Sequence, residues 1–84
     1  MVYKIVWSIS AARELKNLDR SIAKRIYEKV DALSHNPERY VEKLVRYPYY
    51  RLRIGDYRVI LDIEYESLRI LILKVGHGSN VYER

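Results

Sequence analysis

Three arginines within a short tyrosine-rich segment are the side chains of this sequence best suited to bind an anion. Residues 49–60 read YYRLRIGDYRVI and contain Arg51, Arg53 and Arg58. Two alternating apolar runs joined by Gly-Asp predict a β-hairpin, and a two-residue loop pairs Arg53 with Arg58. Like charges directly opposite each other destabilise a strand pair by up to about 1 kcal/mol. The pattern therefore indicates a surface built to receive a negatively charged group.

The same register sorts the hairpin into an apolar face and a basic face. The apolar face is expected to hold Tyr50, Leu52, Ile54, Tyr57, Val59 and Leu61, and the basic face Tyr49, Arg51, Arg53 and Arg58. Residues 43–58 contain five basic side chains and one acidic one, so they hold +4 of the net charge of +5. Basic residues interleaved with tyrosines favour a phosphate-rich partner, and a solvated basic surface without a ligand is the alternative.

Length and composition limit the classes of protein to which the chain can belong. Its 84 residues predict one small domain covering the whole sequence. The chain has no cysteine and only two histidines, which argues against disulfides and a structural metal site. It has neither a signal-like start nor a long apolar run, so we expect a soluble, cytoplasmic protein without membrane contact.

Hydrophobic periodicity predicts a strand, two helices and then a run of strands. The strands are expected at residues 2–7, 49–54, 57–65 and 68–75, the last as a central strand covered on both faces, and the helices at 9–17 and 19–35. Residues 37–48 are expected to be irregular, with a helical turn near residues 38–41, and residues 81–82 to be extended after a loop at 76–80. The order predicts an α+β fold with an αα-hairpin on one face of a small, mainly antiparallel sheet. The arginines then lie on the open face.

Several segments resemble the RelE/ParE superfamily of toxin–antitoxin systems. The resemblance spans essentially the whole chain, and the sequence is similar to the compact, archaeal-type RelE proteins. It rests on YKIVWS at residues 3–8, ARELK at 12–16, Asn36-Pro37, Lys43-Leu44, the hairpin at 50–60, Val75-Gly76-His77 and Val81-Tyr82.

The resemblance implies a ribosome-dependent mRNA endonuclease that cuts the codon in the A site. In such toxins the RNA 2′-OH attacks the neighbouring phosphate without a metal or another cofactor, and a RelB-like antitoxin masks the protein. The working residues of the family correspond here to Arg51, Arg53, Arg58 and Tyr82. We expect Arg58 to stabilise charge on the phosphate and His77 to be a candidate for proton transfer. The expected RNA-binding positions are Lys43, Arg46, Tyr49 and Lys74.

One position departs from the family pattern and keeps other functions open. The terminal motif of the family usually continues with an arginine that belongs to the catalytic group, and this sequence has Gly78 there. The chain is then a weakened endonuclease, a ParE-type toxin that inhibits DNA gyrase without cutting RNA, or an inactive homologue that only binds antitoxin or RNA. His77 as an ordinary loop residue and Tyr82 as a core-edge residue are the structural alternatives.

Overall fold

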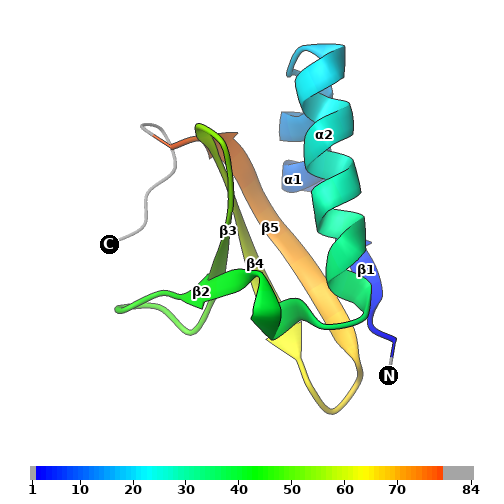
Figure 1. Cartoon of the computed structure of the whole chain (residues 1–84), viewed down its shortest axis with the longest axis vertical. Coiled ribbons are helices and arrows are strands. Elements are labelled where there is room, and N and C mark those ends of the chain that lie inside the picture. Colours follow the sequence, from blue (N-terminus) through cyan, green and yellow to red (C-terminus); the bar gives the residue numbers. More distant parts are fainter. Residues whose placement is uncertain (1, 79–84) are drawn as a thin grey trace.

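Two helices cover one face of a five-stranded sheet in the computed structural model, which describes residues 2–78 (Figure 1). The predicted α+β architecture is confirmed, with both helices inserted between the first and second strands. The elements are β1 (Lys4–Trp7), α1 (Ile9–Lys16), α2 (Arg20–Asp31), β2 (Val41–Lys43), β3 (Tyr50–Ile54), β4 (Tyr57–Glu64) and β5 (Arg69–His77), with single 3₁₀ turns at Ala32–Ser34 and Pro37–Arg39.

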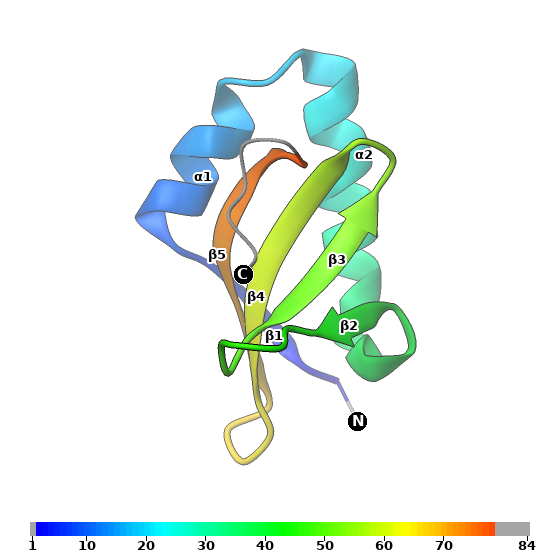
Figure 2. The same cartoon turned by 90° about the vertical axis from the view of Figure 1, so that its left-hand side faces the viewer.

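The strands lie in the order β1-β5-β4-β3-β2. The first strand runs parallel to β5, and the other three pairs are antiparallel, as expected for a mainly antiparallel sheet. A parallel pair needs a long crossover connection, which the helices and the later strands provide here. Among residues 2–78 the helices cover one side of the sheet and leave the other side open, and Figure 2 shows the open side facing the viewer.

The hairpin between β3 and β4 has the predicted register. Arg53 lies opposite Arg58, and Arg51 lies opposite Ile60. The turn is Gly55-Asp56, and Gly55 has a φ of 57°. Positive φ at the first central residue is typical of a type II′ turn, which suits the twist of the flanking strands. The sequence at the turn thus determines which side chains share a face.

The core fills the space between the helices and the sheet. Ser8 caps α1, because its Oγ accepts a hydrogen bond of 2.9 Å from the backbone N–H of Ala11. Trp7 stacks on Tyr27 of α2 with ring centroids 6.1 Å apart, so Trp7 packs against the helices. The core cluster comprises Ala11, Ile26, Val30, Leu33, Leu52, Ile54, Val59, Leu61, Ile63, Ile70, Ile72 and Val75.

Three predicted elements differ from the structure. Residues 41–43 were expected to be irregular, but they form the edge strand β2. The second helix was expected to reach residue 35, but it ends at Asp31 and gives way to a 3₁₀ turn before Asn36-Pro37, where proline disfavours helix at the preceding residue. The terminal strand was expected at residues 68–75, but Leu68 has a φ of 56° and belongs to the turn that precedes β5. The strand also continues through Gly76 and His77, so His77 is a strand residue and not a loop residue.

The prediction of a central strand covered on both faces is wrong for β5. This strand occupies the second position of the sheet, between β1 and β4. Ile70, Ile72 and Val75 are buried beneath the helices, but Leu71 and Leu73 on the other side are only half-buried. Residues 2–78 provide no second layer on that side, so its aliphatic residues belong to the surface of the described part of the chain. No helix among residues 2–78 is long and apolar enough to span a membrane.

Candidate functional site

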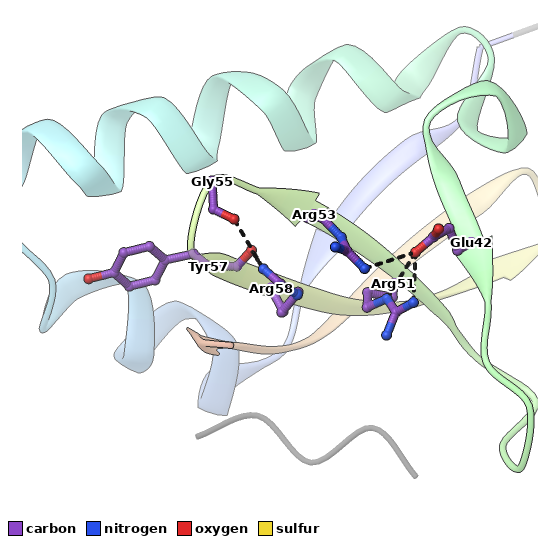
Figure 3. Close-up of polar contacts among 6 residues, drawn as sticks. All are labelled: Glu42, Arg51, Arg53, Gly55, Tyr57 and Arg58. Atoms are coloured by element: carbon purple, nitrogen blue, oxygen red, sulfur yellow. Dashed lines mark hydrogen bonds and ion pairs between the residues drawn. The ribbon is translucent and has the colours of Figure 1, made fainter. Parts of the chain in front are cut away.

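The open side of β3 and β4 carries Arg51, Arg53 and Arg58, and we call this surface the arginine face. Successive side chains of a strand point to opposite faces, so the buried Leu52 and Val59 fix these arginines on the side away from the helices. Figure 3 shows the three guanidinium groups along the hairpin, with Arg58 closest to its turn. Three cations on a single surface can bind a phosphate group through charge-assisted hydrogen bonds.

A carboxylate from β2 lies among these cations. Glu42 pairs with Arg51 across β2 and β3, and its Oε1 accepts hydrogen bonds from Arg51 Nε at 3.1 Å and Nη2 at 2.7 Å. The same oxygen is 3.7 Å from Nη2 of Arg53 (Figure 3). The hydrogen bond from Arg51, followed by the attraction of its charge, lowers the pKa of Glu42 below the ordinary value of 4.5. Glu42 is therefore ionised at neutral pH.

Arg58 is held by the backbone of its own hairpin turn. Its Nη1 donates to the carbonyl oxygens of Gly55 and Tyr57, each at 3.1 Å. Gly78 lies against this guanidinium, because a Cβ at position 78 would be 3.1 Å from Arg58 Cζ and 3.2 Å from the carbonyl oxygen of Asp56. That carbonyl also accepts a 2.7 Å hydrogen bond from the Gly78 N–H. The place of the missing family arginine is thus directly beside Arg58.

An apolar patch adjoins the arginines on the same side of the sheet. Leu44 and Ile60 are buried there, and Tyr49 packs against them. Ile60 lies directly across the hairpin from Arg51, so the patch and the cations are neighbours. It borders an open pocket of about 280 Å³ lined by Leu44, Tyr47, Tyr49, Ile60, Leu73 and Lys74. Two of the predicted RNA-binding residues, Tyr49 and Lys74, therefore lie next to the arginine face.

Two other predicted site residues lie on the opposite side of the sheet. Lys43 pairs with Tyr50, and its Nζ sits 5.0 Å from the centre of that ring. His77 pairs with Tyr57, and their rings meet edge to face with centroids 5.4 Å apart. Since Tyr50 and Tyr57 pack against the helix-side core, the structure separates Lys43 and His77 from the arginine face.

The remaining predicted residues are placed as follows. Arg46 is exposed in the loop between β2 and β3. The Nζ of Lys74 lies 3.1 Å from Oε2 of Glu14 on α1, whose Oε1 also accepts the Val75 N–H at 2.8 Å. Lys74 therefore reaches from the rim of the patch toward α1. Tyr82 lies outside the described residues, so its predicted role stays a prediction.

Sequence reasoning missed Glu42 as part of the site. The residue immediately precedes the basic window, and its strand is only three residues long. The available signal was the alternation in Val41, Glu42 and Lys43, which places Glu42 on the side opposite Val41 once the segment is taken as a strand. Among residues 2–78 the structure has no group of three or more His, Asp or Glu side chains placed to hold a metal ion.

Comparisons with known proteins agree with this architecture. The sequence model of a family described as the ParE toxin of the type II toxin–antitoxin system, parDE, matches residues 5–82. No curated protein sequence matches the chain.

Among solved structures, the toxin–antitoxin complex RelBE2 from Mycobacterium tuberculosis contains a chain with 29% identity and a TM-score of 0.86, and the match covers 92% of this chain and 99% of that one. The archaeal RelE–RelB complex from Pyrococcus horikoshii matches with 30% identity and a TM-score of 0.79, over 96% of this chain and 100% of that one. The Escherichia coli toxin RelE in the free state shares the fold at 18% identity and a TM-score of 0.77, over 93% of this chain and 85% of that one. The chain therefore belongs to the ParE toxin family within the RelE/ParE superfamily and is a toxin of a type II toxin–antitoxin system.

Proposed function

We propose that this toxin is a ribosome-dependent mRNA endonuclease of the RelE type, acting in the cytoplasm on the codon in the ribosomal A site. The observation that carries the proposal is the convergence of Arg51, Arg53 and Arg58 on one open face, with Arg53 and Arg58 directly opposite each other. Such a pair destabilises the hairpin, so its presence favours a surface whose ligand supplies the compensating negative charge. Inhibition of DNA gyrase by surface binding has no evident need for arginines that converge on one face of the sheet.

The proposed reaction is an in-line transfer within the RNA. The 2′-oxygen gives up its proton to solvent and forms a bond to the adjacent phosphorus. The bond from phosphorus to the 5′-oxygen breaks, and that oxygen takes up a proton from solvent, which leaves a 2′,3′-cyclic phosphate and a 5′-hydroxyl. Negative charge grows on the phosphoryl oxygens, and fixed guanidinium groups stabilise it more in the transition state than in the ground state. We assign this role to Arg58, because the carbonyls of Gly55 and Tyr57 hold its guanidinium in place.

The other proposed roles follow from position and chemistry. Arg51 and Arg53 bind the RNA backbone, and the neighbouring tyrosine patch contacts a base, as aromatic side chains do with unpaired RNA. Arginine does not take the proton of the 2′-OH, because its guanidinium is already protonated and has no free lone pair to accept one. His77 packs against Tyr57 on the other side of the sheet, which argues against it as the base. Tyr82, which the family resemblance places among the working residues, is proposed to stack on a base.

We further propose a RelB-like antitoxin as the partner. Two of the similar solved structures are complexes of a RelE toxin with a RelB antitoxin. An antitoxin segment with acidic side chains complements the arginine face and neutralises the toxin by covering it. Masking of this kind predicts that the antitoxin and RNA compete for the same surface.

Inhibition of DNA gyrase without RNA cleavage is the second candidate function. It is supported by the description of the matching family as ParE toxins and by Gly78 at the position where the RelE pattern has an arginine. The retained arginine face favours the endonuclease over this alternative.

One experiment separates the two functions. Purified toxin is incubated with ribosomes programmed with a defined mRNA, and the new RNA ends are mapped, while gyrase supercoiling is measured with the same preparation. Cuts within the A-site codon that require the ribosome support the endonuclease. Intact mRNA together with inhibited supercoiling would replace that proposal with the gyrase function.

A further inference from the structure

A carboxylate of the toxin itself occupies the phosphate-binding part of the arginine face. We propose that Glu42 is an internal competitor for RNA: it holds Arg51 and Arg53 in the free toxin and is displaced when a phosphodiester binds. This inference rests on the proposed function, because it takes the arginine face to be the RNA-binding surface. It adds a residue that sets RNA affinity and that the family resemblance does not include.

The contacts of Glu42 are those that a phosphate oxygen would make. One oxygen, Oε1, accepts from both Nε and Nη2 of Arg51 and lies within ion-pair distance of Nη2 of Arg53. Arginine binds carboxylate and phosphate oxygens with the same fork of donors. A phosphodiester cannot make full use of Arg51 and Arg53 while the carboxylate keeps these donors.

Exposure makes the carboxylate easy to displace. The Glu42 side chain is 58% exposed and that of Arg53 is 56% exposed, so water competes for both. Exposed ion pairs contribute little net stability. Backbone pairing of residues 41–43 with β3 holds the edge strand, so the fold does not depend on the Glu42 side chain. Glu42 can therefore rotate away into solvent while β2 stays paired.

The charges on this face give the expected size of the gain in RNA affinity when Glu42 is neutralised. The three arginines and Glu42 together carry three positive charges and one negative charge. Neutralising Glu42 removes a repulsion from a phosphate about 6 Å away and frees two donors, which we expect to tighten RNA binding about threefold to tenfold at low salt. For single-stranded nucleic acid, each additional neutralised phosphate steepens the dependence of log affinity on log salt by about 0.7.

The test compares RNA binding by wild-type toxin, Glu42→Gln and the charge-matched control Glu66→Gln. Glu66 is exposed in the turn between β4 and β5, at the end of the sheet opposite the β3–β4 turn (Figure 1). The probe is a short single-stranded RNA methylated at every 2′-oxygen, so that it lacks the attacking hydroxyl and only binding is measured. A second variant, Glu42→Thr, suits a strand and keeps the test valid if glutamine disturbs the edge.

We expect both Glu42 variants to bind the probe about threefold to tenfold more tightly than Glu66→Gln, with a steeper salt dependence. Equal or weaker binding by both Glu42 variants would overturn the inference. An Arg58→Ala variant distinguishes failure of the proposed role of Glu42 from failure of the proposed RNA-binding face. If Arg58→Ala binds weakly while the Glu42 variants show no gain, only the role of Glu42 fails. If Arg58→Ala binds as well as wild type and the Glu42 variants show no gain, the proposed RNA face fails with it.

Discussion

Replacing Arg53 with threonine is expected to stabilise the folded toxin. Arg53 and Arg58 are direct cross-strand partners, and like charges in this position cost up to about 1 kcal/mol. Among residues 2–78, the ion pair of Arg53 is a 3.7 Å contact with Glu42, in which both side chains are more than half exposed. Threonine suits a strand because it is β-branched. We expect the free energy of unfolding to rise by about 0.5 kcal/mol, which corresponds to about 2–4 °C in Tm for a domain of this size.

Arg51→Thr, the same substitution two residues earlier, is a matched control for which we expect the opposite change in the free energy of unfolding. Arg51 lies on the same strand and the same face, but its cross-strand partner is Ile60. Its guanidinium donates twice to Glu42, and its side chain is only 22% exposed. Arg51→Thr removes these contacts and relieves no like-charge pair, so we expect it to lower the free energy of unfolding.

Urea denaturation at about 10 mM and 1 M salt measures both variants. The Debye length falls from about 30 Å to about 3 Å over this range, so the gain from Arg53→Thr should shrink at high salt. A lower stability for Arg53→Thr at low salt would refute the reasoning that the hairpin is strained by its arginines. A gain that persists unchanged at 1 M salt would assign the effect to threonine itself and not to relief of repulsion.

Two further predictions concern the surroundings of these arginines. Gly78→Ala should lower the rate of mRNA cleavage about tenfold with little change in stability, because the new Cβ would lie 3.1 Å from Arg58 Cζ and must shift that guanidinium. In an Arg58→Ala background, the same substitution should lower the rate no further. An equal loss of rate in that background would exclude this cause. The pKa of Glu42 is lowered in the folded state, mainly by its hydrogen bond from Arg51, so the stabilisation is present above pH 4.5 and is lost as the pH falls through the depressed folded pKa. The stability difference between wild type and Glu42→Gln should therefore shrink below pH 4.5 in urea titrations, and a difference that grows there would contradict the assignment.

The hairpin could be predicted from the sequence because every signal for it is local. Alternating apolar residues, the Gly55-Asp56 turn and a two-residue loop fix the pairing of Arg53 with Arg58 without reference to the rest of the chain. The two helices were predicted for the same reason, since their apolar stripes and the cap at Ser8 are contained in the segments themselves.

The rest of the site depends on pairings between segments far apart in the sequence. Glu42 reaches the arginines only because residues 41–43 join the edge of the sheet, and three residues carry too little periodicity to predict a strand. The side on which His77 lies is set by the register of β4 with β5, in which Ile60 faces Lys74 but Leu61 faces Ile72. This irregularity adds Leu73 to β5 as an extra residue, and no local sequence pattern predicts it.

If the arginine face binds and activates the scissile phosphate, cleavage should depend strongly on Arg58. Single-turnover cleavage of mRNA on programmed ribosomes should be measured for wild type, Arg58→Lys and Arg58→Ala, with unfolding curves to show that each variant is folded. Loss of one fixed donor to a developing oxyanion typically costs about 10²–10³ in rate. We predict a loss of at least about 100-fold for Arg58→Ala, and a smaller loss for Arg58→Lys, which keeps the charge but not the fork of donors. Cleavage by folded Arg58→Ala at close to the wild-type rate would contradict the account.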